Sequence, residues 1–129
     1  MLDTDISSYI IRKRPESVRA RFREMEGEQL CVSAVSEAEL LYGVKVKGSP
    51  RALAAMVADF LRRLTVLDWS RIAAQHYADI RVKLEQAGTP IGNMDLLIAA
   101  HARSAGAVLV TNNQKHFLRV PGLKLENWT

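Results

Sequence analysis

The chain has 129 residues, of which 48% are hydrophobic, and it carries a formal net charge of +4. This length and apolar content suffice for one ordinary core, so we expect a single domain over residues 1–129. No stretch approaches the roughly 18 apolar residues of a membrane span, and no basic region followed by an apolar run opens the chain, which predicts a cytoplasmic protein without membrane contact. The one cysteine, Cys31, rules out an internal disulfide and a multi-cysteine zinc site.

Short apolar runs alternate with longer segments of helical period along the chain. The expected strands are residues 1–3, 30–35, 64–69, 107–113 and 123–128. The expected helices are residues 5–13, 15–25, 36–46, 50–64, 70–88 and 92–106. Alternating strands and helices predict an α/β domain with a parallel sheet covered by helices on both faces.

Polar residues and glycines mark the ends of several expected helices. Ser36, Ser70 and Asn93 stand at positions suited to an N-cap, where a side-chain oxygen accepts hydrogen bonds from the first free N–H groups. Gly88 and Gly106 follow helical segments, where a left-handed residue commonly ends a helix. These residues therefore indicate where the chain changes direction.

Basic residues gather early in the chain, in "IRKRPESVRARFR" and in "VKVKGSPR". A surface of this kind favours a polyanion such as RNA, so Arg12, Lys13 and Arg14 are candidate substrate-binding residues. The alternative is that these residues form only the solvated faces of amphipathic helices. Aromatic residues make up 6% of the chain, so base stacking is not the expected main mode of binding.

Three carboxylates are expected at one edge of the sheet. Asp3 lies at the end of the first expected strand, while Glu39 and Asp95 lie in the first turns of expected helices that begin at the carboxyl ends of strands. Thr111 and Asn113 end another strand at the same edge. Binding sites of open α/β sheets collect along this edge, so we expect these side chains to meet there.

Converging carboxylates repel one another unless a cation neutralises them. Oxygen donors without Cys or His partners favour Mg²⁺, or Mn²⁺, over zinc. Such an ion activates water and offsets charge during phosphodiester hydrolysis. Asp3, Glu39 and Asp95 are therefore candidate catalytic residues of a metal-dependent nuclease.

Each candidate also has a structural alternative. Ser36 and Glu39 have the spacing of a capping box, and Asp95 near a helix start is favoured by the helix dipole whatever its function. Asp3 has no local structural role that the sequence indicates. The three histidines, His76, His101 and His116, lie on separate segments without ligand spacing and are expected to be surface or packing residues.

The segments "MLDTD", "SEAELLYG", "GTPIGNMDLLIAAHARSAGAVLVTNN" and "FLRVPGLKLENW" resemble the PIN-domain toxins of the VapC family. The likeness extends over essentially the whole chain. The resemblance implies a PIN-like fold with a parallel five-stranded sheet in the order 3-2-1-4-5. It also implies a magnesium-dependent endoribonuclease, a homodimer, and a VapB-type antitoxin that covers the active site within a larger toxin–antitoxin assembly.

The resemblance also implies a substrate and assigns residue roles. The expected substrate is tRNA, with the anticodon region of initiator tRNA as one candidate, so that cleavage stops translation and growth. Asp3 and Asp95 match metal ligands, and Glu39 matches an acid expected to reach the ion through water.

The chain departs from the family pattern at two positions. Asn113 stands near the place where many relatives carry a fourth acid, so Asn113 and Thr111 are assigned supporting roles. Asp5 stands where relatives usually carry Asn. We expect Asp5 to cap the first helix and to support the site without binding the ion directly.

Three other functions are considered. A PIN fold that binds RNA without cutting it would not need three acids. A receiver-type phosphoacceptor domain also has acids at strand ends, but it gives Glu39 and Asp95 no part, and the interval from Asp5 to Asp68 is too long for that family. A DNA-directed nuclease uses the same chemistry and stays open.

Overall fold

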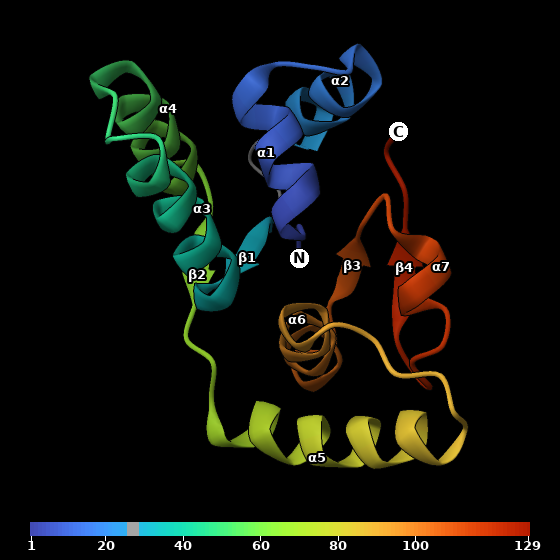
Figure 1. The fold of residues 1–129 in the computed structure, drawn as a ribbon. Coiled ribbons are helices and arrows are strands. Elements are labelled where there is room, and N and C mark those ends of the chain that lie inside the picture. The colour runs from blue at the N-terminus through green and yellow to red at the C-terminus, as the bar shows by residue number, and fades with distance from the viewer. Residues whose placement is uncertain (26–28) are drawn as a thin grey trace.

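The computed structural model describes residues 1–25 and 29–129 (Figure 1). Its helices are α1 (Thr4–Arg12), α2 (Glu16–Met25), α3 (Ala34–Val46), α4 (Arg51–Arg62), α5 (Arg71–Gln86), α6 (Asn93–Ser104) and α7 (Gln114–Phe117). Its strands are β1 (Cys31–Ser33), β2 (Thr65–Leu67), β3 (Val108–Val110) and β4 (Lys124–Glu126). The predicted alternation of strands and helices is confirmed, whereas the short helix α7 was not predicted.

The strands are shorter than the apolar runs predicted. The run at residues 30–35 forms strand only over Cys31–Ser33, because the Ser33 hydroxyl accepts a hydrogen bond from the N–H of Val35 at 3.1 Å and starts α3 there. The prediction that Ser36 caps this helix is therefore wrong. Asn93 is likewise the first residue of α6 and Gly92 is its N-cap, whereas Ser70 caps α5 as predicted.

In the described residues the strands form two parallel pairs, β1 with β2 and β3 with β4. The N-terminal residues lie between the pairs: the N–H of Leu2 donates to the carbonyl of Cys31 at 2.9 Å, and Leu2 forms a parallel bridge with Val110. Figure 1 shows the N-terminus between β1 and β3. One continuous sheet in the order 3-2-1-4-5 remains a prediction.

Two buried apolar clusters flank the N-terminal segment. Leu2 belongs to the cluster that joins α1, α2, α3 and α4, and Met1 belongs to the one that joins α5, α6 and β3. Residues 1–3 are therefore fixed from both sides by apolar burial as well as by backbone hydrogen bonds. Among the described helices, none is both long and apolar enough to span a membrane.

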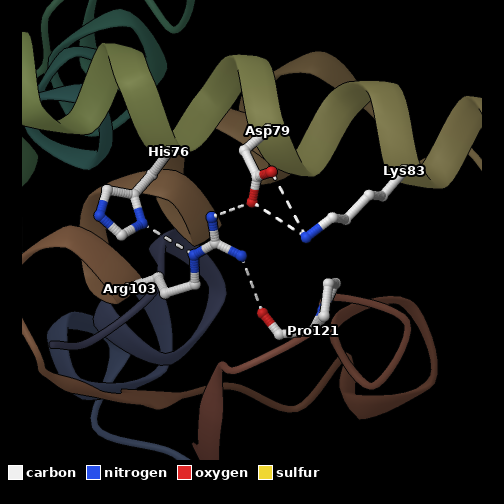
Figure 2. Close-up of polar contacts among 5 residues, drawn as sticks. All are labelled: His76, Asp79, Lys83, Arg103 and Pro121. Carbon is white, nitrogen blue, oxygen red and sulfur yellow. Dashed lines mark hydrogen bonds and ion pairs between the residues drawn. The ribbon is translucent and has the colours of Figure 1, made fainter.

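A polar cluster fastens α5 and α6 to the turn before β4 (Figure 2). The Arg103 guanidinium, whose side chain is 15% exposed, donates to His76 Nδ1 at 2.8 Å, to Asp79 Oδ2 at 2.7 Å and to the carbonyl of Pro121 at 3.0 Å. The Arg103 hydrogen bond lowers the pKa of Asp79, and Lys83 contacts the same carboxylate. His76 is thus a packing residue, as predicted.

Replacing Arg103 with Ala is expected to lower the free energy of unfolding by about 1–3 kcal/mol, because His76 and Asp79 on α5 and the carbonyl of Pro121 all lose their hydrogen-bond donor. Urea denaturation followed by circular dichroism measures this loss. Arg81→Ala is the matched control, because the Arg81 side chain is exposed and bonds only within α5 among the described residues. A loss no larger than that of the control would contradict the assigned role.

Candidate active site

Asp3 lies at the point where the N-terminal segment turns into α1. Its N–H donates to the carbonyl of Val110 at 3.0 Å, and its Oδ1 accepts from the N–H of Ile6 at 2.8 Å, so that Asp3 is the N-cap of α1. The Ser7 hydroxyl donates to the Asp3 carbonyl at 2.8 Å. Asp3 therefore has the local structural role that the sequence did not indicate, and the backbone on both sides fixes its carboxylate.

The Asp3 carboxylate is 5% exposed, and burial is the main reason that its pKa is raised from 3.8 to about 6. Hydrogen bonds from the Thr111 hydroxyl and from the N–H of Ile6 act in the opposite direction, whereas the negative charges of Asp5 and Asp95 raise the pKa further. The ionised form is thus disfavoured here, which is the condition that a bound cation would relieve.

Asp95 lies in the first turn of α6 and is half-buried. Burial raises its pKa and so does the charge of Asp5, whereas His116 lowers it. Its Oδ2 lies 3.4 Å from Asn113 Nδ2, which donates a hydrogen bond, and 3.8 Å from His116 Nδ1. The prediction that Asp95 stands at a helix start is confirmed. The helix dipole favours an acid at this position, but it does not explain the contacts of Asp95 with Asn113 and His116.

Glu39 lies in the second turn of α3, not in the first, because α3 begins at Ala34. Its Oε1 accepts a hydrogen bond from the Thr4 hydroxyl at 2.5 Å, and the Thr4 hydroxyl also lies 3.1 Å from the Ser36 hydroxyl. Glu39 does not cap its helix, so the capping-box alternative is wrong. Its contact with Thr4 instead places Glu39 beside the residue that follows Asp3.

Asp5 is exposed in the first turn of α1. The expectation that Asp5 caps this helix is wrong, because the chain leaves its extended form one residue earlier and Asp3 takes the cap. The charge of Asp5 nevertheless raises the pKa of both Asp3 and Asp95. Asp5 therefore faces the same region and adds negative charge to it.

Thr111 and Asn113 form hydrogen bonds that support Asp3 and Asp95. Thr111 is fully buried; its hydroxyl donates to Asp3 and its Oγ1 accepts from the N–H of Asn113 at 2.9 Å. The Asn113 side chain connects Asp95 to His116, whose Nδ1 lies 2.9 Å away. The segment between β3 and α7 thus forms hydrogen bonds with both Asp3 and Asp95.

His116 is a site residue that sequence reasoning missed. It was expected on the surface or in packing, but it lies beside Asp95. The available signal was its spacing from Asn113, because residues three apart share one face of a helix. His101, by contrast, is buried with Nδ1 2.7 Å from the Ser33 hydroxyl, and burial lowers its pKa, so it is a packing residue as predicted.

Arg12, Lys13 and Arg14 are exposed at the end of α1, away from its N-cap. The Arg12 guanidinium lies 5.7 Å from the centroid of the Tyr9 ring. Their assignment to substrate binding stays a prediction.

The donor chemistry of the site fits a hard cation. Among residues 1–25 and 29–129, no three His, Cys, Asp or Glu side chains lie close enough together to hold a metal ion by themselves. Burial is the main reason that the pKa values of Asp3 and Asp95 are raised, and the negative charge of Asp5 raises both further. Carboxylate oxygens are the protein donors that Mg²⁺ prefers, and Mg²⁺ commonly needs only one or two of them with water completing its shell.

Comparisons with known proteins agree along the whole chain. Ribonuclease VapC2 of Haemophilus influenzae is 44% identical over 128 residues, which cover 99% of this chain and 96% of that protein. The tRNA(fMet)-specific endonuclease VapC of Shigella flexneri is 43% identical over 129 residues, covering 100% and 97%. The structure also matches a chain in the crystal structure of VapBC2 from Rickettsia felis bound to a DNA fragment from their promoter, with a TM-score of 0.93, 41% identity, and coverage of 100% and 98%.

The family model described as the PIN domain matches residues 1–123. The PIN-type α/β fold predicted from the sequence is therefore confirmed, and so is the resemblance to VapC. The chain belongs to the PIN-domain family and, within it, to the VapC ribonucleases.

Proposed function

We propose that the protein is the toxin of a VapBC-type toxin–antitoxin pair and acts as a metal-dependent endoribonuclease. The observation that carries this proposal is that Asp3 and Asp95, at the starts of α1 and α6, bond to the same short segment: the Thr111 hydroxyl donates to Asp3, and Asn113 Nδ2 donates to Asp95 Oδ2 at 3.4 Å. The charge of Asp95 also raises the pKa of Asp3. Structural roles alone do not require a buried and a half-buried acid to lie in one region, because their repulsion destabilises the fold.

Asp3 and Asp95 are the proposed direct ligands, and Glu39 would act through water. When bound, Mg²⁺ or Mn²⁺ supplies an activated water and offsets the charge that develops on the phosphate. Thr111 and Asn113 orient the two aspartates by their hydrogen bonds, and Thr4 orients Glu39. No Ser, Cys or Lys nucleophile is assigned, so the expected products carry a 5′-phosphate and a 3′-hydroxyl.

The proposed substrate is a structured RNA, with tRNA as the first candidate. The Shigella flexneri relative is named as specific for tRNA(fMet), and its identity of 43% over the full chain supports the same substrate class here. The anticodon region of the initiator tRNA is the region we propose for the cut, which would inhibit translation and growth. Parallel incubation with DNA of the same sequence discriminates the DNA-directed alternative.

A small antitoxin is the proposed protein partner. The matched Rickettsia felis structure is a VapBC2 complex, and this chain offers a groove of about 330 Å³ between α1, α2 and α4. Ile10, Ile11, Phe22 and Met56 line it, and Met56 is 39% exposed. Such a groove fits the apolar face of a partner helix. An Arg from the partner could then pair with the carboxylates.

Three finer features belong to the same proposal. Residues 1–3 serve as the central strand of a sheet ordered 3-2-1-4-5, supported by their hydrogen bonds to both Cys31 and Val110. The protein forms a homodimer, for which the exposed apolar residues Leu41, Tyr42 and Val46 of α3 provide a candidate surface. It acts in the cytoplasm, where its RNA substrate lies.

Expression of this chain alone is expected to arrest growth, and coexpression with its antitoxin, sought in a short neighbouring reading frame, is expected to restore it. The measurement is colony formation and culture density after induction. Asp95→Asn is the control that should remove toxicity at equal protein level. Unimpaired growth under strong induction of the wild-type chain would count against the toxin assignment.

Two alternative functions remain to be compared with the toxin assignment. A PIN domain that binds RNA without cutting it would leave the toxicity of Asp95→Asn unchanged, because binding does not need the ligand charge. The receiver-type alternative has no support from the family match over residues 1–123.

A further inference from the structure

A second hollow lies at the end of α1, apart from the groove between α1, α2 and α4. It has a volume of about 460 Å³ and is lined by Tyr9, Arg12, Arg14, Pro15, Asn112 and Thr129. That volume lies within the range of small-molecule sites. Its lining residues include two arginines, and their acidic group is the terminal carboxylate of Thr129. The lining therefore keeps a net positive charge, which suits an anion that carries an apolar part.

Side-chain contacts hold part of this hollow in place. The Arg12 guanidinium lies over the Tyr9 ring, and Arg12 Nε donates to the Ser8 carbonyl at 3.4 Å. The Tyr9 hydroxyl accepts from Asn112 Nδ2 at 3.5 Å, and Asn112 Oδ1 accepts from the Thr129 hydroxyl at 2.8 Å. Arg12 and the neighbouring side chains of Tyr9 and Asn112 are therefore held in position before a ligand binds.

The second arginine is available for a ligand. Arg14 is exposed, and its side chain forms no hydrogen bond or ion pair with any other residue in the described part of the chain. An unpaired guanidinium beside a positioned one is the arrangement that binds a phosphate through two or more charge-assisted hydrogen bonds.

Two residues that line the hollow are close in sequence to residues of the candidate active site. Asn112 follows Thr111, whose hydroxyl donates to Asp3. Tyr9 lies six residues after Asp3 on α1, which corresponds to about 9 Å along the helix. An RNA strand with one phosphate beside Asp3 and Asp95 therefore has its neighbouring nucleotides within reach of this hollow.

We propose that the hollow at the end of α1 binds a nucleotide of the RNA substrate next to the cleaved bond. Arg12 and Arg14 hold its phosphate, and Tyr9 and Pro15 contact its base. This inference rests on the proposed ribonuclease function. The groove between α1, α2 and α4 differs because most of its lining residues are apolar, which suits a partner helix better than a polyanion.

The first test measures RNA binding without cleavage. The full chain with Asp95→Asn binds a fluorescent oligoribonucleotide of the cut region, and anisotropy is recorded over a range of salt concentrations in chelator. Adding Arg12→Ala and Arg14→Ala is expected to weaken binding at least about tenfold. It should also reduce the slope of log affinity against log salt by about 0.7, since both arginines hold one phosphate and each lost phosphate contact on a single strand removes about 0.7.

The matched control adds Arg71→Ala and Arg81→Ala instead, which removes the same charge from exposed positions on α5. Figure 1 shows α5 along the opposite edge of the molecule from α1. This control should lose far less affinity. Arg14→Ala alone covers the case in which loss of Arg12 disturbs folding, because Arg14 has no side-chain partner in the described residues, and Arg14→Lys should restore part of the affinity.

The second test uses the active chain and substrates shortened one nucleotide at a time from each end. The Arg12→Ala/Arg14→Ala variant should raise KM about tenfold or more on long substrates with kcat nearly unchanged, because the lost contacts bind ground state and transition state alike. On substrates too short to reach the hollow, variant and wild type should be equal. This dependence on length is not expected from a merely structural role.

The possible outcomes separate the two proposals. Equal affinity and equal KM for the arginine variant and the wild type on every substrate would overturn the nucleotide site while leaving the ribonuclease function intact. A wild-type chain that neither binds nor cuts RNA would overturn both. A variant that loses affinity for the antitoxin but keeps its affinity for RNA would assign the hollow to the protein partner and overturn this inference.

Discussion

Replacing Asp3 or Asp95 with Asn is expected to lower the rate of RNA cleavage by about 1000-fold or more while both variants stay folded. Each change keeps the size of the side chain and removes one proposed ligand charge. Asn also caps helices as well as Asp does, so α1 keeps its start at position 3. Initial rates on a tRNA substrate at fixed Mg²⁺ measure the effect, and circular dichroism checks the fold.

Asp5→Asn is the internal control for that result. Asp5 is exposed and is not the helix cap, and its charge only raises the pKa of Asp3 and Asp95 from a distance. This variant should keep most of its activity and toxicity. If Asp5→Asn loses as much activity as Asp3→Asn, with both proteins folded, then Asp5 binds the ion and its supporting role is wrong.

The second large effect concerns stability. In excess chelator at about pH 8, Asp3→Asn is expected to raise the free energy of unfolding by roughly 2–3 kcal/mol, because it removes a buried charge whose pKa is raised from 3.8 to about 6. The folded protein binds this proton more tightly than the unfolded chain, so the charge of Asp3 costs stability above about pH 6. The cost disappears as the pH falls towards about 4.

Urea titrations of wild type and Asp3→Asn across this pH range measure the difference. Asp5→Asn should change stability little at any of these pH values. Addition of Mg²⁺ should stabilise the wild type and leave Asp3→Asn nearly unaffected, because a ligand that binds only the folded state raises its stability. A gap between the two proteins that does not vary with pH would contradict burial of the Asp3 charge as its cause.

Periodicity and end signals predicted most of the fold. Six predicted helical segments have counterparts in α1 to α6, and Gly88 and Gly106 adopt the left-handed conformation, with φ of 69° and 64°. Strand lengths were overestimated, because apolar character continues past Ser33 while the Ser33 hydroxyl already starts α3. A local capping interaction decided that boundary against the apolar run.

The candidate site was predictable in part. The rule that strand ends and helix starts share one edge indicated where Asp3 and Asp95 would lie. In the structure the charge of Asp95 raises the pKa of Asp3, and the charge of Asp5 raises the pKa of both. The cap formed by Asp3 and the contact between His116 and Asp95 were missed. The cap depends on the backbone geometry at Asp3, and the contact of His116 depends on how α7 packs. Neither can be inferred from the spacing of residues in the sequence.

The most direct test of the account is to map the RNA ends produced by the purified chain from total tRNA, with Mg²⁺ and with excess chelator. We expect discrete internal cuts that leave a 5′-phosphate and a 3′-hydroxyl and that require the divalent ion. The Asp95→Asn protein should not make them. Cuts that persist unchanged in excess chelator, or in the Asp95→Asn protein, would contradict this mechanism.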